Sequence, residues 1–227
     1  FESQIFKKLA ENDPTTALEE FGKLDKARMS SALQGILQTV KSTEEFKSLA
    51  NIMALKEGSD RHLQSILYSW SRKNAIEALD YTESIDNKKQ KEQAIKKIKH
   101  GWMREKPEEA SKWIMANTED KAKGLQEVVN GWSWKDGTKA LNFIETQEVE
   151  NKDKAYEAYV SRFSWSDPKS ATNALDYIDD PKMRKRAVQR LYSTLRHKSN
   201  ATAQEFLESR NEFTAEEKEN MSKAKRH

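Results

Sequence analysis

Histidine, cysteine, serine and paired carboxylates supply most reactive groups and metal ligands in proteins, and their spacing in this sequence favours neither use. The chain has no cysteine, which excludes a thiolate nucleophile, a disulfide framework and cysteine-ligated zinc. No two of its histidines lie four residues apart, as two metal ligands on one helix face would. These histidines are His62, His100, His197 and His227. We therefore predict that the protein holds no metal and no cofactor.

Catalytic motifs are equally sparse. The pattern Ser-x-x-Lys occurs at 166–169 and 222–225, but the motifs that accompany it in enzymes are absent. The sequence also lacks a nucleophile elbow, a P-loop, a dinucleotide-binding fingerprint and a His-Glu-x-x-His motif. The adjacent carboxylates of Glu108 and Glu109 fall in the first turn of a predicted helix, where the helix dipole favours acidic residues. The sequence thus predicts a protein that is not an enzyme.

Charged side chains form the one pattern that suggests binding. Segment 88–104 has seven Lys and Arg residues against one Glu, and segment 182–198 has seven and no acid. Segment 74–86 has four acidic residues and no base. Between the two basic segments, 121–135 and 151–165 carry net charges of only +2 and +1. The basic side chains expected to face outward are the candidate partner-binding residues Lys96, Lys97, Arg186 and Arg190.

Two interpretations of these charges remain open. In the first, the charges solvate the surface and form ion pairs between neighbouring helices. In the second, the basic residues make a stripe that binds an acidic partner. If the basic residues do not bind, the acidic segments become the better candidate.

The elements that position these residues follow from an internal repeat of 30 to 32 residues. Seven anchor residues define it: Leu9, Val40, Trp70, Trp102, Trp132, Phe163 and Leu195. Four residues before each anchor lies an apolar residue: Ile5, Ile36, Ile66, Ile98, Val128, Tyr159 and Leu191. Eight residues after each anchor lies a small residue: Ala17, Ser48, Ala78, Ala110, Ala140, Ala171 and Ala203. Three columns aligned over seven units indicate a repeated structural unit.

Each unit reads as a helical hairpin. The apolar positions before the anchor share one face of a helix, here called helix B, that ends at or just past the anchor. A second helix, A, begins four or five residues later, where capping side chains and prolines gather. The capping residues are Asp13, Asn74, Asp136, Asp167 and Ser199, and the prolines are Pro14, Pro107 and Pro168. A single hairpin cannot bury its apolar face, so the hairpins must stack.

The predicted fold is therefore all-α: a right-handed α-solenoid of about seven helical-hairpin repeats of about 31 residues. The solenoid should span 1–212, and 213–227 should form a C-terminal capping helix and basic tail. Thr214 and Glu217 have the spacing of a capping box for that last helix. The chain begins with Phe1 inside a B-helix pattern, so we expect further sequence upstream.

Composition agrees with a polar helical protein. Charged residues make up 34% of the chain, there are only seven glycines and four prolines, and the mean hydropathy is −0.97. The net charge of +3 gives no overall attraction to nucleic acid or anionic membranes. No apolar run approaches the roughly 20 residues of a transmembrane helix.

Three stretches, "WMREKPEEASKW", "WSWKDGTKALNF" and "WSDPKSATNAL", carry a family resemblance. They resemble the Trp-x3-Pro-x2-Ala-type helical-hairpin repeats of bacterial envelope and secreted proteins, within the wider tetratricopeptide and HEAT class of superhelices. The resemblance covers nearly the whole chain and implies a fold without shared catalytic residues. Together with the lack of cysteine, it favours the bacterial periplasm or cell envelope over the cytoplasm.

These observations predict a non-catalytic scaffold that presents an extended helical-repeat surface to a protein or peptide partner. The alternative is a module whose basic face binds nucleic acid or another polyanion. A steep salt dependence of binding to a duplex or single strand would distinguish the second function.

Overall fold

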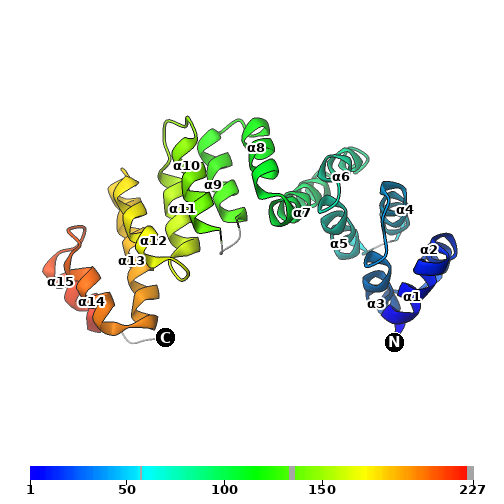
Figure 1. Cartoon of the computed structure of the whole chain (residues 1–227), viewed down its shortest axis with the longest axis horizontal. Coiled ribbons are helices and arrows are strands. Elements are labelled where there is room, and N and C mark those ends of the chain that lie inside the picture. Colours follow the sequence, from blue (N-terminus) through cyan, green and yellow to red (C-terminus); the bar gives the residue numbers. More distant parts are fainter. Residues whose placement is uncertain (57, 133–135, 224–227) are drawn as a thin grey trace. The chain divides into compact units, whose positions relative to one another are not determined.

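The computed structural model describes residues 1–56, 58–132 and 136–223, and all of the regular structure in them is helical (Figure 1). These described residues form 15 α-helices and one short 3-10 helix, which confirms the all-α prediction. The chain divides into two compact units, Phe1–Ala110 and Ser111–His227. The boundary between the units falls within α8 (Pro107–Asn117).

The helices alternate as the hairpin pattern predicts. Those of the first unit are α1 (Glu2–Asn12), α2 (Pro14–Lys23), α3 (Lys26–Leu37), α4 (Thr43–Ala54), α5 (Asp60–Ser71), α6 (Ala75–Thr82) and α7 (Lys88–Glu105). Those of the second are α9 (Lys121–Gly131), α10 (Gly137–Thr146), α11 (Asp153–Phe163), α12 (Pro168–Ala174), the 3-10 helix η1 (Leu175–Tyr177), α13 (Pro181–Lys198), α14 (Asn200–Glu208) and α15 (Ala215–Lys223). The odd-numbered helices α1 to α13 correspond to the predicted B helices and the even-numbered ones to the A helices.

Packing is sequential within each unit. The substantial contacts among the described helices join elements one or two places apart along the chain. In the first unit, α1 packs on α2 and α3, and α5 packs on α3, α4, α6 and α7. In the second unit, α11 packs on α9, α10, α12 and α13. Most of the described helices therefore bury their apolar faces against their neighbours in the chain, whereas α15 has no buried residue. None of the described helices is long and apolar enough to cross a membrane.

Polar side chains on successive hairpins meet at separations close to one repeat. In the first unit Arg72 donates to Glu105, 33 residues further on, with an Nη2–Oε2 distance of 2.8 Å. In the second unit Lys185 donates to Glu217, 32 residues further on, with an Nζ–Oε1 distance of 2.6 Å. Because neighbouring hairpins place equivalent positions side by side, these separations are close to the predicted period of about 31 residues.

The predicted apolar columns form most of the core. Among the anchors, Trp70 and Trp102 are each 2% exposed, Trp132 is 1% exposed and Phe163 is fully buried. The aromatic rings also contact one another: Trp70 stacks on Phe46 of α4, with 5.8 Å between ring centroids. Six of the seven anchors are therefore buried core residues, as their spacing predicts, whereas Leu9 is only partly buried.

The first repeat departs from the predicted register. Ile5 is 44% exposed, whereas Phe6 and Ala10 are buried. The Phe6 ring lies 6.4 Å from the ring of Phe21 on α2, in an edge-to-face arrangement. The core-facing side of α1 is thus displaced by one residue, and the prediction for Ile5 is wrong.

The second repeat departs from the predicted register by two residues. The N-cap of α4 is Ser42, which lies two residues after the anchor Val40 instead of the predicted four. The position four residues after the cap, which holds a small residue in the other repeats, is therefore occupied by Phe46. Ser48 is exposed, so the predicted register, which aligns it with the buried alanines of the other repeats, is wrong here. A shorter connection between α3 and α4 accounts for the shift.

Helix starts follow the predicted chemistry closely. Side chains at four of the five predicted caps accept a hydrogen bond from a backbone amide: Asp13, Asn74, Asp167 and Ser199. The exception is Asp136, which makes no such bond. The prolines at 14, 107 and 168 each begin an A helix, and the fourth, Pro181, begins the B helix α13. Four residues separate Trp102 from Pro107, one more than in the Trp-x3-Pro-x2-Ala pattern.

The C-terminal helix α15 begins with the predicted capping box. The Thr214 amide donates to Glu217 Oε2 at 2.9 Å, and the Glu217 amide donates to Thr214 Oγ1 at 3.2 Å. Residues 224–227, which include the predicted basic tail, His227 and the lysine of the second Ser-x-x-Lys pattern, lie outside the described residues.

Two glycines allow B helices of the first unit to approach closely. A Cβ on Gly35 of α3 would overlap the carbonyl oxygen of Ser3 on α1 and lie 3.0 Å from the Lys7 nitrogen. A Cβ on Gly101 of α7 would overlap Ser71 Oγ on α5 and lie 2.6 Å from the carbonyl oxygen of Tyr68. Because these neighbours are largely backbone atoms, the contact between the helices depends on the missing side chain.

Candidate functional site

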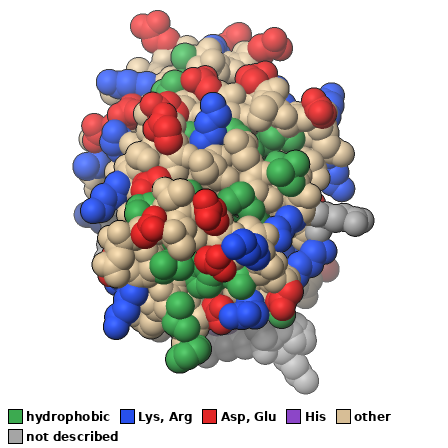
Figure 2. Space-filling model, turned by 90° about the vertical axis from the view of Figure 1, so that its right-hand side faces the viewer, with side chains coloured by type: hydrophobic (Ala, Val, Ile, Leu, Met, Phe, Trp, Pro, Cys, Tyr) green, Lys and Arg blue, Asp and Glu red, His purple; other side chains and the backbone are tan. Residues whose placement is uncertain are grey.

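The predicted binding residues fall into two pairs. Lys96 and Lys97 are exposed on α7 in the first unit, and neither has an ion-pair partner among the described residues. Arg186 and Arg190 are exposed on α13 in the second unit, each with 56% of its side chain accessible. On the face that Figure 2 presents, Lys and Arg side chains are interspersed with Asp and Glu side chains rather than gathered by sign.

Glu157 of α11 lies beside both arginines. Its Oε1 atom is 3.4 Å from Arg186 Nε and 3.8 Å from Arg190 Nη1, and only 12% of its side chain is exposed. These ion pairs join two B helices. The sequence suggested pairs between A and B helices, and one such pair also occurs, between Lys91 Nζ of α7 and Glu83 Oε2 at the end of α6, at 2.7 Å. The carboxylate partly neutralises the positive charge that this pair of arginines presents to a partner.

Several of the other residues whose side chains could act in catalysis or bind a metal make contacts within the structure. The hydroxyl of Ser166 donates to the carbonyl oxygen of Phe163 at 3.4 Å. His62 Nε2 lies 2.8 Å from Ser30 Oγ on α3. The ring of His100 lies 5.6 Å from that of Tyr68 on α5. The contact of His62 with Ser30 does place an imidazole beside a hydroxyl, but it lies on the exposed surface and neither residue lines the pockets described below.

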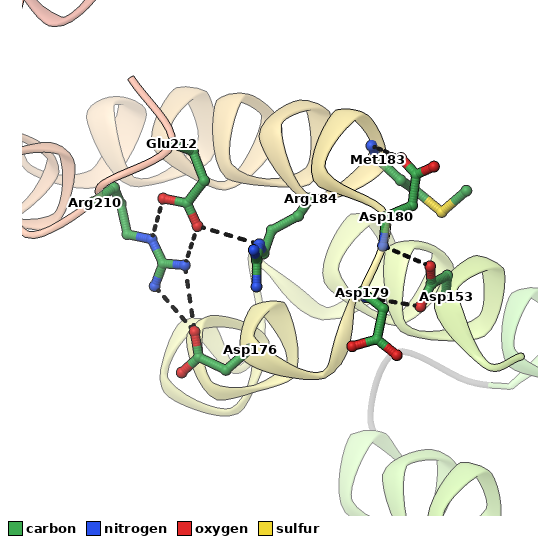
Figure 3. A network of polar contacts seen from close by, with 8 residues as sticks. All are labelled: Asp153, Asp176, Asp179, Asp180, Met183, Arg184, Arg210 and Glu212. Atoms are coloured by element: carbon green, nitrogen blue, oxygen red, sulfur yellow. Dashed lines mark hydrogen bonds and ion pairs between the residues drawn. The ribbon is translucent and has the colours of Figure 1, made fainter. Parts of the chain in front are cut away.

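A pocket of about 550 Å³ in the second unit is built around an arginine–carboxylate network (Figure 3). Arg210 donates to Glu212 through Nη2 at 2.6 Å and through Nε at 3.1 Å, and its Nη2 also lies 3.3 Å from Asp176 Oδ1. Arg184 Nε is 3.6 Å from Glu212 Oε1. The network joins the segment between α14 and α15 to η1 and α13. Since each carboxylate already holds an arginine, we assign the network a structural role.

Asp153 supports the same part of the second unit (Figure 3). Its side chain is 4% exposed and accepts hydrogen bonds from the amides of Asp179 at 2.9 Å and Asp180 at 2.8 Å. These bonds tie the start of α11 to the connection that leads into α13. A buried carboxylate that satisfies two backbone amides is thus another structural group.

Acidification should weaken the arginine–carboxylate network. Burial would raise the pKa of Glu212, but the hydrogen bonds from Arg210 outweigh it and lower that pKa below its ordinary value. The stabilisation is therefore present above the unfolded-state pKa and is lost as the pH falls through the folded-state value. We expect Glu212→Gln to lower the free energy of unfolding at neutral pH and to flatten its decline between about pH 5 and pH 3, measured by urea melts.

The matched control is Glu208→Gln, which removes an exposed carboxylate on α14. In this variant the free energy of unfolding should decline with falling pH as it does in wild type. Equal declines for Glu212→Gln and Glu208→Gln would show that Arg210 does not stabilise the ionised Glu212 carboxylate.

The candidate site lies in the first unit, between α4 and α6. A pocket of about 430 Å³ there has Trp70 of α5 among its lining residues. The remaining residues of its wall are Thr43, Lys47 and Asn51 of α4, Glu77, Asp80 and Tyr81 of α6, and Ser84. A second pocket, of about 620 Å³, shares Asn51, Tyr81 and Ser84 with the first and continues to the connections that follow α4 and α6. Because they share these lining residues, the two pockets adjoin each other, and together they are here called the α4–α6 groove.

Aromatic packing holds the inner part of the groove. Trp70 is stacked on Phe46 and lies 5.7 Å, between ring centroids, from Tyr81. Burial raises the pKa of Tyr81, so its hydroxyl stays neutral at physiological pH. These rings are fixed by the core, so the residues that line the groove above them have a rigid support.

The groove is acidic. Glu77, Asp80, Asp60 and Asp86 line it, against two lysines, Lys47 and Lys56. The Lys56 ammonium already donates to the carbonyl oxygen of Leu24 at 3.1 Å. Three of these carboxylates belong to the segment 74–86 and its connection to α7, whose lack of bases the sequence makes plain. The acidic A-helix surface that the sequence offered as the second choice is therefore the one with a groove.

Comparisons with protein-family models, with curated proteins and with solved structures each found no match.

Proposed function

We propose that this protein is a non-catalytic scaffold with an α-solenoid fold, and that its α4–α6 groove binds a peptide segment of a protein partner. The sequential packing of hairpins and the contacts at separations close to one repeat support the solenoid. Such folds bind partners through surfaces that several repeats build together.

The groove itself is the observation that carries the proposal. It is lined by two successive A helices, and its two connected parts each have a volume within the roughly 300–1,000 Å³ of small-ligand sites. An elongated ligand can occupy both parts at once. The alternative, a basic face that binds a polyanion, has weaker support because Glu157 offsets Arg186 and Arg190, which leaves Lys96 and Lys97 as its best residues.

Asn51→Trp tests the groove directly. Asn51 is exposed on α4 and lines both parts of the groove, so a bulky ring there should fill it without disturbing the core. Random heptapeptides displayed on phage are first selected on the wild-type chain. We expect synthetic copies of the enriched peptides to bind Asn51→Trp at least about tenfold more weakly than wild type, measured by fluorescence anisotropy.

The control is Ser48→Trp, which adds the same ring at an exposed α4 position that lines neither pocket. It should bind the peptides as wild type does. If Asn51→Trp binds equally well, or if no peptide is enriched, the groove is not a peptide site. Binding of a labelled DNA duplex that falls steeply with salt, and that is lost on reversing Lys96, Lys97, Arg186 and Arg190 to Glu, would support the polyanion function instead.

A further inference from the structure

On the basis of the proposed function, we infer that the groove selects a peptide segment with a lysine or arginine side chain. Glu77 and Asp80 hold that cation, and Glu77 does so after exchanging its present partner, Thr43, for the indole N–H of Trp70. Two observations carry this proposal: the indole N–H of Trp70 is buried without an acceptor, and Glu77 is bonded across the groove.

The indole of Trp70 differs from its counterpart in the fourth repeat. The Trp102 Nε1 group donates to Glu109 Oε1, seven residues further on, at 3.2 Å. Glu77 stands seven residues after Trp70, in the same position of its own repeat. Yet the Nε1 atom of Trp70, a residue only 2% exposed, has no hydrogen-bond acceptor among the described residues. A buried donor without an acceptor is unfavourable, so this indole favours any change that supplies an acceptor.

Glu77 accepts instead from the hydroxyl of Thr43 on α4. This hydrogen bond spans the groove, because Thr43 and Glu77 lie on its opposite walls. A peptide that enters between α4 and α6 must break it. The Glu77 carboxylate can then accept from Trp70 as Glu109 accepts from Trp102, and the new bond offsets the lost one. The groove can therefore open at little cost.

The released carboxylate favours a cation. Glu77 and Asp80 are three residues apart on α6, which places them on one side of the helix. Asp80 is exposed and has no ion-pair partner among the described residues. A carboxylate has two oxygens and about four acceptor sites, so Glu77 can take the indole N–H and a ligand cation together. Guanidinium or ammonium groups form the stronger, charge-assisted bonds with such a pair.

The charges along the rest of the groove also favour a positively charged ligand. Asp60 and Asp86 line the second part, and Asp60 accepts from Gln90 Nε2 at 2.9 Å. An excess of carboxylates between low-dielectric walls attracts positively charged ligands and repels acidic ones. We therefore assign the partner as a basic peptide segment rather than an acidic or neutral one.

The experiment uses the heptapeptides enriched on the full chain. Each is synthesised as selected and with its Lys or Arg replaced by Gln, and both forms are titrated against wild type. We expect basic residues to be enriched, and the Gln peptides to bind about tenfold more weakly or worse. The double variant Glu77→Gln/Asp80→Asn should bind the selected peptides more weakly by the same factor. It should also bind the selected peptides and their Gln forms with equal affinity. If the double variant does not fold, the same titrations are made with Asp80→Asn alone.

The charge-matched control is Glu11→Gln/Glu44→Gln. It removes two exposed carboxylates of the first unit that lie outside the groove, so it changes the net charge by the same two units as the groove variant. This control should keep wild-type affinity. If it weakens binding as much as the groove variant does, the effect is a general one of net charge and the proposal is overturned.

The exchange of Glu77 has its own signature. The indole ¹H–¹⁵N signal of Trp70, assigned through its loss in Trp70→Phe, should move downfield when the basic peptide binds, because the N–H gains an acceptor. An unchanged signal with a saturated groove would overturn the exchange. Peptides that are blocked by Asn51→Trp but show no basic preference would leave the scaffold function standing and overturn the ligand class. Peptides unaffected by Asn51→Trp would overturn the proposed function itself.

Discussion

Gly35→Ala should lower the free energy of unfolding of the first unit by about 3 kcal/mol, which is a large part of the stability of an ordinary domain. The new Cβ would overlap the Ser3 carbonyl oxygen and press on the Lys7 amide of α1. Both are backbone atoms, so no side chain can rotate away, and α1 and α3 must separate. Circular dichroism melts of the full chain would measure the loss.

Gly22→Ala is the matched control for this prediction. Gly22 also lies in a helix, α2, but a Cβ there would meet its nearest neighbour, Ile52 Cγ2, at an ordinary 4.0 Å. Alanine has the higher helix propensity, so this variant should be neutral or stabilised by up to about 1 kcal/mol. If both variants unfold at the wild-type denaturant concentration, α1 and α3 do not pack as closely as described.

Trp102→Ala should cost about 3–5 kcal/mol, the range for removing a buried aromatic side chain. The ring is 2% exposed at the end of α7, and its indole N–H donates to Glu109. Alanine would leave a cavity and also leave the Glu109 carboxylate without this donor. The stability of Trp102→Phe should lie between those of wild type and Trp102→Ala, because phenylalanine restores most of the volume but not the N–H.

Trp165→Ala removes an identical side chain from a different environment. Trp165 is 61% exposed, and its main described contact is with the Lys198 ammonium, 4.8 Å from the ring centroid. Such an exposed cation–π contact contributes about 0.5–1 kcal/mol. Trp102→Ala should therefore melt well below Trp165→Ala. Similar melting temperatures would mean that Trp102 is not a core residue.

The candidate site was only partly predictable. The acidic character of 74–86 is visible in the sequence, and so is the spacing of seven residues that relates Glu77 to Trp70. What the sequence does not contain is the contact between Glu77 and Thr43, 34 residues apart, which leaves the Trp70 indole without an acceptor. Which acceptor a donor finds depends on how two helices are rotated against each other, and composition says nothing about that rotation.

The helices, their order and most of the core can be predicted from the order of the amino acids alone. Caps such as Asp13 and Asn74, prolines at the first turn and apolar residues four apart act within a few residues of themselves, so they can be read from one segment at a time. The contacts between segments about 30 residues apart cannot be predicted in this way and become visible only in the folded chain. The pairing of Arg186 with Glu157, the close approach at Gly35 and the displaced register of Phe46 all depend on helix crossing and connection length, which are set by the packing of whole hairpins.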